Sequence, residues 1–564
     1  MFTGIVHRDV NGDFWFDDRR VRGPDDLPQG RAWKGTLWYA PDGIGANDWA
    51  RIMRPGDAGF GPRPGHLLGA TFQLPKRGQF KVMSASTWGV GDRDPNRCSD
   101  DLTELFVQAR AIGLPIRGSA AATAVQTYLD RWDGKDDAHP KMKQLPCQWR
   151  GLAHAAMHGG PIAVLRASGT NVAQIDVHRA YLAALHEPVP VLGSDAAGKV
   201  GGYYTTDDRR WASIRKLCGF VDASVRVHGD RQDPAGLPPL AVHLGFGTAY
   251  PRGLLRGAWT IAEVREAEER GEVEVIAVHQ FCFAPVTRPL FAEAADLFAS
   301  FPMPLGKRLY TRFWGKLGSR GGFVAHKSEE PIEGEVPLSG LWWRWEGIPL
   351  DSHKAPRTYR PDLASFVCAH NHRNVMKTLR QLAPASVLAV HVDAIWTTDI
   401  AGCKRACPPP VEARPGEWKL KRTGPVRFYG VGCYRHGDHL AASGYDAHVF
   451  GRLTPDRMEK WINGSRNMHR RMVLESRHWT ADPAQDATAT SRPLTLIMDP
   501  ARSPAEGPSV YDPAWTIGGW RRKPEAGDGP ISTAPPTAGD ASTRPWPRPL
   551  DPVIAAAVEP PLGE

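Results

Sequence analysis

The chain has 564 residues, which is too long for one compact hydrophobic core, so we expect about two to four domains. A hydrophobic fraction of 41% and 20 tryptophans exclude a chain that is disordered throughout. The formal net charge of +9 favours a polyanionic partner, although a basic chain alone does not prove one.

Targeting and membrane segments are not expected. Residues 1–20 interleave charged and apolar positions and lack the apolar centre of a signal peptide. No uninterrupted apolar run has the length that spans a bilayer, so we expect a soluble, cytoplasmic protein. The eight cysteines are scattered, which is typical of free thiols, and Cys403 and Cys407 have no second pair at zinc-finger spacing.

The first 150 residues predict a small α/β domain. They are rich in Gly, Pro, Asp and Arg and contain short β-type runs, such as residues 35–39 and 79–83. Apolar residues at helical spacing predict helices over residues 101–111 and 120–132. The polar, proline-containing residues 133–146 predict a linker.

The next stretch of the chain predicts alternating strands and helices. Residues 163–185 predict a strand, a turn at 168–170, a second strand ending at Asp176, and then a helix. We further expect strands over residues 219–227 and 273–278, with a helix over 261–270 between them. A pair of helices should follow over residues 291–300 and 305–317, separated by the helix-breaking Phe301-Pro-Met-Pro304.

The last third predicts a long amphipathic helix over residues 363–382, followed by a hairpin with Asp393 at its tip. Residues 437–520 give no clear pattern. From Arg521 the chain is rich in Pro, Ala, Gly and Thr and carries two basic clusters, so we expect residues 521–564 to be disordered.

Two aspartates stand beside apolar, β-type runs: Asp176 at the end of Val172-Ala-Gln-Ile-Asp176, and Asp393 between Val387-Leu-Ala-Val-His-Val392 and Ala394-Ile-Trp-Thr397. A single aspartate at a strand end is usually a turn or helix-capping residue. Two partly buried carboxylates are costly unless a cation compensates their charge. Brought together, they would form a site for Mg²⁺, which prefers carboxylate and carbonyl oxygen with water and phosphate.

Three segments, in chain order, carry a family resemblance. They are Asp176-Val-His-Arg-Ala-Tyr181, then Lys307-x3-Thr311-x2-Trp314-Gly315, then His391-Val392-Asp393. They resemble the first palm motif, the fingers motif and the second palm motif of family B DNA polymerases, in particular those of the protein-primed phage branch.

Other segments resemble the same branch and extend the resemblance over about residues 155–436. Met157-His-Gly159-Gly160 precedes the palm where protein-primed members have Tyr-x-Gly-Gly. The remaining matches are Trp259-Thr-Ile-Ala-Glu263, Ala369-His-Asn-His-Arg373, Trp418-Lys-Leu-Lys421 and Gly432-Cys-Tyr434.

The resemblance implies a role for each matching residue. Asp176 and Asp393 would be catalytic and ligate two Mg²⁺ ions, with the Val177 carbonyl adding an oxygen. Other positions would bind the incoming dNTP, namely Tyr181, Lys307 and Thr311, with Tyr181 excluding a 2′-hydroxyl. The rest would contact the DNA primer–template, namely Gly159, Gly160, Gly315, Arg373, Lys421 and Tyr434.

The chain also departs from the family pattern. His391 stands where the second palm motif has its first Asp, and Gly432 stands where the family has the Lys of Lys-x-Tyr. Family B enzymes often carry a proofreading exonuclease with an Asp-x-Glu motif near the N-terminus. The only Glu in residues 1–150 is Glu104, and no Asp lies two positions before it, so we expect a degenerate exonuclease-like domain without proofreading.

The resulting prediction is an α/β, multidomain, right-hand polymerase that extends a primer hydroxyl during phage replication, with a terminal protein as a possible primer. An inactive palm that acts as a DNA-binding scaffold, a primer-synthesising or translesion polymerase, and a nuclease are the alternatives. The expected divisions are an N-terminal domain (1–150), a first palm segment (151–289), fingers (290–325), a second palm segment (326–436), a thumb-like region (437–520) and the tail (521–564).

Overall fold

A computed structural model describes most of the central region of the chain and shorter segments elsewhere. The described long ranges are 95–164, 168–192, 201–228, 237–244, 247–250, 253–303, 305–319, 357–407, 413–430 and 433–442. Outside them, residues 78–88 and a set of short strands are described.

The chain divides into two compact units, each made of segments that are distant in sequence. Unit 1 contains Met1–Cys147, Glu293–Arg360 and Glu475–Thr488, and unit 2 contains Gln148–Ala292, Pro361–Leu474 and Ala489–Glu564. The helical pair near residue 300 therefore belongs to the same unit as the N-terminal residues.

Unit 1 is built on a mixed sheet of ten strands among the described residues. At its centre β1, β4 and β7 run parallel to one another, and β2 and β3 extend this side of the sheet antiparallel beyond β1. The order is β18 (Val336–Ser339), β19 (Trp342–Trp345), β17 (Phe323–Lys327), β5 (Ala58–Gly61), β6 (Thr71–Leu74), β7 (Gly78–Ser84), β4 (Thr36–Ala40), β1 (Phe2–Arg8), β2 (Phe14–Phe16) and β3 (Arg19–Val21).

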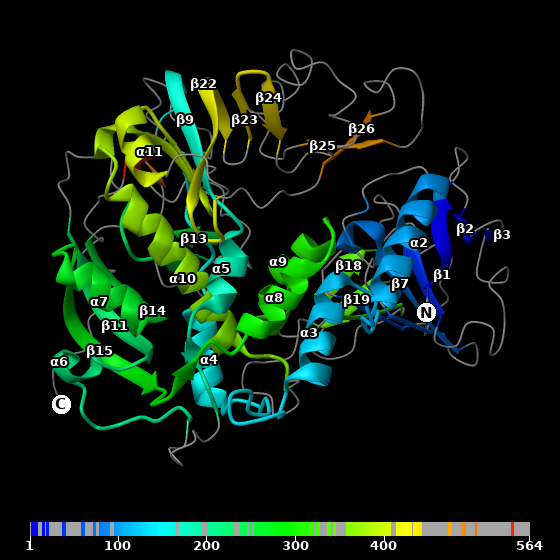
Figure 1. Ribbon diagram of the computed structural model, residues 1–564, viewed down its shortest axis with the longest axis horizontal. Helices are drawn as coiled ribbons and strands as arrows, with labels where there is room; N and C mark the ends of the chain where they lie inside the picture. Colours follow the sequence, from blue (N-terminus) through cyan, green and yellow to red (C-terminus); the bar gives the residue numbers. More distant parts are fainter. Residues whose placement is uncertain are drawn as a thin grey trace. The chain divides into compact units, whose positions relative to one another are not determined.

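The helices of unit 1 are held by aromatic packing and by capping. The Trp88 indole donates to the Tyr39 hydroxyl (2.9 Å) in the core, and Ser119 caps α3 by accepting from the Ala122 N–H (3.2 Å). Helices α3 and α9 pack together (Figure 1). The ring of Tyr128 on α3 contacts that of Phe313 on α9. The described helices are η3 (Ala85–Trp88), α2 (Pro95–Ala111), α3 (Ala120–Arg131), α8 (Ala292–Ser300) and α9 (Leu305–Leu317).

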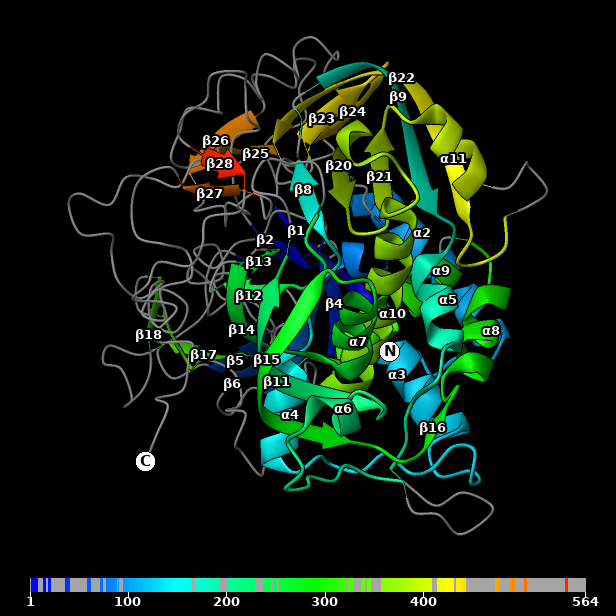
Figure 2. The same ribbon diagram turned by 90° about the vertical axis from the view of Figure 1, so that its left-hand side faces the viewer.

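Unit 2 contains a seven-stranded sheet in which every described pair of neighbours is antiparallel (Figure 2). Strand β9 lies in its middle, between β21 and β22, although these strands are far apart in sequence. The order is β24 (His439–Ala442), β23 (Cys433–His436), β22 (Trp418–Gly430), β9 (Ser168–Val177), β21 (Ala394–Thr397), β20 (Val387–His391) and β8 (Ile162–Val164).

The two faces of this sheet differ, because successive side chains of a strand point to opposite sides. Ala173, Ile175 and Val177 of β9 pack in one buried cluster with Val375 of helix α10 (Pro361–Leu379). Helices α5 (Ala180–His186) and α11 (Ile400–Ala406) contribute to the same cluster. Val172 belongs instead to a second cluster, with Trp396 and Phe428, so Gln174 and Asp176 lie on the face away from the helices.

A smaller sheet of unit 2 has the order β14 (Gly253–Thr260), β11 (Gly219–Val227) and β15 (Val273–Phe283). Helix α7 (Ile261–Glu269) packs on it, and Val264 and Ala267 share a core with Val221 and Val225. The remaining described elements are α4 (Cys147–Ala155), α6 (Trp211–Ile214), η4 (Pro384–Ser386), β10 (Val189–Pro190) with β16 (Thr287–Arg288), β12 (Val242–Leu244) with β13 (Gly247–Ala249), β25 (Met472–Ser476) with β26 (Ala487–Ser491), and β27 (Arg502–Pro504) with β28 (Thr543–Pro545).

The mixture of helix and sheet agrees with the predicted fold class, and most predicted elements in the described ranges are confirmed. One detail is wrong: Ser168-Gly-Thr170 is not a turn but the beginning of β9. The long strand β22 explains the difference, because Ser168 and Gly169 pair with its Arg427 and Val426.

Several predictions fall on residues that the structure does not describe. Most of 437–520 and nearly all of the tail from residue 521 lie outside the described residues, as does Gly432. Among the helices that are described, none combines the length and the apolar character needed to cross a membrane.

Candidate active site

Asp176 lies at the end of the central strand of the unit 2 sheet, on the face without helices. In the sheet register it faces Ala394 of β21 on one side and Lys419 of β22 on the other. Directly opposed residues of antiparallel strands place their side chains on the same face. The Asp176 carboxylate, 18% exposed, is therefore accessible from solvent and flanked by β22.

Asp393 lies beside Asp176 because it belongs to the two-residue turn of the adjacent β20–β21 hairpin. His391 pairs with Ala394 across this hairpin, which confirms the expected turn at Asp393. The Val177 N–H donates to the Asp393 carbonyl (2.9 Å), so the end of β9 is bonded to the turn. The sheet thus brings together Asp176, Val177 and Asp393, the three residues predicted to hold metal.

A lysine side chain contacts one of these two aspartates. The Lys421 Nζ donates to Asp176 Oδ2 at 2.9 Å. The neighbouring Lys419 Nζ donates to His178 Nδ1 (3.1 Å), since an ammonium group can only donate. Burial, together with the positive charges of Lys419 and Arg179, lowers the pKa of His178, which favours the neutral imidazole that accepts this bond.

Tyr181 lies in the first turn of α5, where the chain leaves β9 through Arg179 in a left-handed conformation (φ 48°). Burial raises the pKa of Tyr181, and the charges of Cys368 and Asp393 act in the same direction. The phenol therefore stays protonated at neutral pH.

Tyr434 packs on the helix-free face of the sheet. Its ring meets Trp396 edge-on with centroids 5.0 Å apart and also contacts Phe428. Burial raises the pKa of Tyr434, while Arg422 and Lys421 oppose the shift. Tyr434 thus shares with Asp176 both a face of the sheet and a neighbouring cation, Lys421.

The predicted nucleotide-binding residues of the fingers motif lie on helix α9 in unit 1. Lys307, Thr311 and Gly315 are spaced four residues apart and share one side of the helix, on which Lys307 and Gly315 are exposed. The Thr311 hydroxyl donates to the Lys307 backbone carbonyl (2.6 Å), as hydroxyls inside helices often do.

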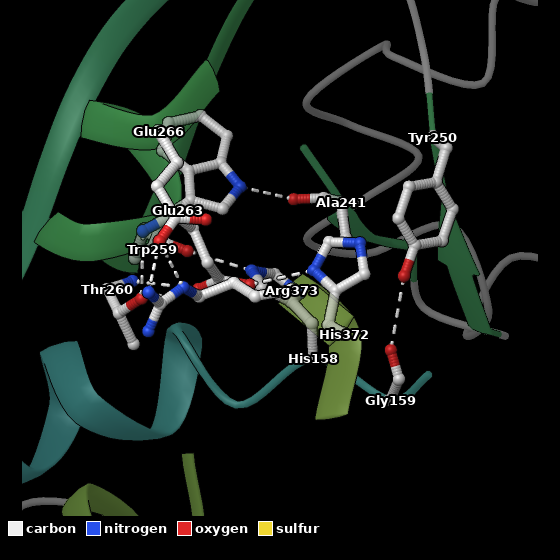
Figure 3. A network of polar contacts seen from close by, with 11 residues as sticks. His158, Gly159, Ala241, Tyr250, Trp259, Thr260, Glu263, Glu266, His372 and Arg373 are labelled. Carbon is white, nitrogen blue, oxygen red and sulfur yellow. Dashed lines mark hydrogen bonds and ion pairs between the residues drawn. The ribbon is translucent and has the colours of Figure 1, made fainter. Parts of the chain in front are cut away.

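Arg373 and Gly159, both predicted to contact DNA, belong to a polar network that joins α7 to α10 (Figure 3). Arg373 Nε donates to Glu266 Oε1 (2.7 Å), and Tyr250 donates its hydroxyl to the Gly159 carbonyl (3.2 Å). At the centre of the network, Glu263 pairs with His372 at 2.9 Å, and both side chains are about 95% buried.

Glu263 also closes a capping box at the start of α7. Thr260 accepts from the Glu263 N–H (3.3 Å), and Glu263 Oε2 accepts from the Thr260 N–H (3.2 Å). Burial by itself raises the pKa of Glu263, but the hydrogen bond and charge of His372, with help from His158 and Thr260, lower it overall.

The donor set at the end of β9 fits a hard cation. The two carboxylates and a backbone carbonyl supply only oxygen, which is the ligand type that Mg²⁺ prefers. The Asp176 carboxylate already holds a cation here, the Lys421 ammonium. No group of three or more His, Cys, Asp or Glu side chains at metal-binding distance occurs among the described residues, so further ligands would come from substrate and water.

His391 cannot supply a carboxylate ligand, because its side chain is an imidazole. It pairs with Ile162 of β8 and Ala394 of β21 at the end of β20. Burial lowers the pKa of His391, so the imidazole is uncharged at neutral pH. The site therefore contains two acidic residues rather than the three of the family motifs.

Two relationships were not predicted from sequence. The contact of Lys421 with Asp176 was missed, although the period-two spacing of Lys419 and Lys421 indicates that both lie on one face of a strand. The buried pair of Glu263 with His372 was also missed. The signal for it was the Thr260-x-x-Glu263 capping box, which shows a Glu fixed at a helix start but not its distant partner.

The fold resembles that of a solved DNA polymerase. The chain is similar in structure to Phi29 DNA polymerase in its orthorhombic crystal form, with a TM-score of 0.53 over 75% of this chain and 86% of that one, at 12% sequence identity. It is equally similar to the Phi29 DNA polymerase complex with primer–template DNA and incoming nucleotide, with a TM-score of 0.54, the same coverage and 11% identity. No protein-family model and no curated protein sequence matches the chain.

Proposed function

We propose that the chain is a DNA-directed DNA polymerase that extends a primer hydroxyl with dNTPs, with Asp176 and Asp393 as its catalytic carboxylates. The observation that carries the proposal is that Asp176, at the end of β9, and Asp393, in the adjacent hairpin turn, lie at the same end of the central sheet. The fold shared with Phi29 DNA polymerase, which has been solved with primer–template DNA and incoming nucleotide, supports it.

Two Mg²⁺ ions bound by Asp176, Asp393 and the Val177 carbonyl would polarise the α-phosphate and lower the pKa of the primer 3′-hydroxyl. The protein's own side chains would orient the incoming nucleotide and neutralise its negative charge. The exposed Lys307 on α9 would bind the triphosphate, where negative charge develops on the departing pyrophosphate. Tyr181 would pack under the sugar, from the first turn of α5 just beyond the end of β9.

We further propose that unit 1 contains a degenerate exonuclease-like domain and that the enzyme does not proofread. Exonucleolytic hydrolysis by two metals needs carboxylates on the strands that frame the site. Five neighbouring described strands, β3, β2, β1, β4 and β7, contain neither Asp nor Glu. A phage replication role with DNA, RNA or protein as primer is consistent with this assignment.

A DNA-binding scaffold without catalysis is the second candidate. It is favoured by the Lys421 ammonium on Asp176 and by the uncharged His391 in place of a carboxylate. Both features reduce the negative charge available to a metal pair. We rank it below the polymerase because both aspartates are present and the backbones that carry them meet at one end of the sheet.

A primer-extension assay with the purified full-length protein, Mg²⁺ and dNTPs distinguishes the polymerase from the scaffold. We expect extension by the wild type and at least a thousandfold loss in Asp176→Asn and in Asp393→Asn, as is typical when a group acting on the reacting atoms is removed. Asp208→Asn is the matched control, since that aspartate pairs locally with Arg210 at the surface. Tight DNA binding without extension, in Mg²⁺ and in Mn²⁺, would favour the scaffold.

A further inference from the structure

The turn that presents Asp393 has an unusual backbone. Val392 adopts φ 60°, which is disfavoured for a β-branched residue, and the Asp393 N–H donates to the His391 carbonyl at 2.8 Å. A bond from residue i+2 back to residue i, with positive φ between them, is the strained form of the γ-turn. Such a conformation persists only where surrounding structure holds it.

Residues Gly160 and Pro161 provide that support. The Val392 N–H donates to the Pro161 carbonyl at 2.6 Å, and His391 pairs with Ile162 of β8 directly beyond it. The segment before β8 is therefore bonded to the turn through its backbone. On the other side, the Val177 N–H fixes the Asp393 carbonyl, so the turn is held between β9 and residues 160–162.

The approach of Gly160 to Val392 leaves no room for a side chain. A Cβ atom at Gly160 would lie 2.8 Å from Val392 Cγ1, 2.9 Å from its Cα and 3.1 Å from its carbonyl oxygen. Two of these three atoms are backbone, so rotation of the Val392 side chain cannot relieve the contact. A Cβ at the adjacent Gly159 would meet no atom within 4 Å.

We infer that Gly160 is a positioning residue, whose missing side chain lets residues 160–161 pack against the Val392 turn and thereby fixes the Asp393 carboxylate. This rests on the proposed polymerase site. It differs from the expectation that both glycines serve to approach a template phosphate. That role would make the two positions similar, whereas the packing around them is not.

The test compares Gly160→Ala with Gly159→Ala in the full-length protein, using Mn²⁺ as the probe and electron paramagnetic resonance to measure its binding without DNA or nucleotide. We expect Gly160→Ala to weaken Mn²⁺ binding at least about tenfold, as is typical when groups that orient metal ligands are lost. Gly159→Ala should bind Mn²⁺ like the wild type. Equal Mn²⁺ affinity in a folded Gly160→Ala and the wild type would overturn the inference.

A second variant keeps the test decisive if Gly160→Ala does not fold. Val392→Gly removes the closest contact and tolerates the positive φ, but the Cα and carbonyl contacts remain. We therefore expect Gly160→Ala/Val392→Gly to fold and to bind Mn²⁺ more weakly than Val392→Gly alone. Equal affinity in these two variants would refute the inference.

Failure of the inference is distinguishable from failure of the proposed function. If Asp176→Asn does not reduce Mn²⁺ binding and the wild type does not extend primers, the polymerase site itself is wrong. If the wild type does extend primers and loses Mn²⁺ on Asp176→Asn, while Gly160→Ala changes neither, only the positioning role is refuted.

Discussion

The Lys421 ammonium lies 2.9 Å from one oxygen of Asp176, on the carboxylate that we propose as a metal ligand. The side chain of Lys421 is 43% exposed and that of Asp176 18%, so water screens the pair. Ion pairs of this kind are worth about 0.2–1 kcal/mol. A divalent metal can therefore displace the Lys421 ammonium from Asp176, and this ion pair does not prevent metal binding.

Replacement of Lys421 tests this competition. Lys421→Met should strengthen Mn²⁺ binding to the DNA-free protein about two- to fivefold, because the metal no longer displaces an ammonium group. The measurement is a Mn²⁺ titration followed by electron paramagnetic resonance. Lys419→Met is the control, since Lys419 bonds to His178 and not to a carboxylate. Weaker Mn²⁺ binding in Lys421→Met would contradict the idea of competition.

Lys307 should act on the nucleotide. If its exposed ammonium contacts the triphosphate, Lys307→Ala loses a charge-assisted hydrogen bond worth roughly 1.5–3 kcal/mol. We expect kcat/KM for dNTP to fall about ten- to a hundredfold, with unchanged affinity for primer–template. Arg308→Ala, on the next residue and a different side of α9, should leave kcat/KM within about twofold of the wild type.

Tyr181 should set the preference for deoxynucleotides. Tyr181→Ala opens space under the sugar, and we expect the ratio of dNTP to rNTP incorporation to fall at least about tenfold, the scale on which small steric differences discriminate substrates. Tyr181→Phe keeps the ring and should keep the ratio. The readout is single-nucleotide extension with matched dCTP and CTP, and an unchanged ratio in Tyr181→Ala would exclude this role.

The buried pair of Glu263 and His372 should make stability depend on pH. The folded-state pKa of Glu263 is lowered, so its contribution to stability is present above the unfolded value of about 4.3 and is lost as pH falls through the folded value. Glu263→Gln leaves His372 with an uncharged partner. We expect the free energy of unfolding at pH 7 to drop by roughly 3 kcal/mol.

Denaturant unfolding between about pH 3 and pH 8 measures both effects. Glu263→Gln should also flatten the loss of stability below about pH 5, because one carboxylate that titrates on unfolding is gone. Glu266→Gln is the matched control. Its pair with Arg373 is partly exposed, so its removal should cost at most about 1 kcal/mol. An unchanged pH profile in Glu263→Gln would show that the pair does not contribute.

The convergence of the two aspartates was predictable, whereas their surroundings were not. Asp176 and Asp393 each stand beside a run of apolar residues, and this local pattern indicates a strand end and a hairpin tip. The contact of Lys421 with Asp176 joins residues 245 positions apart, and that of Glu263 with His372 spans 109. Such contacts depend on strand order and helix packing, which hydrophobic periodicity does not encode.

The left-handed backbone of Val392 was unpredictable for a different reason. Positive φ is disfavoured for valine, and the turn is held by the hydrogen bonds of Val392 to Pro161 and of Val177 to Asp393 on its two sides. The predicted turn at residues 168–170 failed in the same way, since pairing with β22 extends β9 over a glycine that would otherwise end it. In both places tertiary contacts override the local preference of the residue.

Because side chains alternate along β9, the pairing register of this strand decides whether Asp176 faces solvent or the core. Ile175 and Val177 enter the core beneath α10, and Asp176 between them faces outward only while β9 keeps its pairing with β21 and β22. A slip of β9 by one residue against β21 and β22 would turn the Asp176 carboxylate into the apolar core and an isoleucine or valine outward. A slip of two residues would preserve its direction. The direction of Asp176 is therefore set by the pairing register of β9 rather than by the length of the strand.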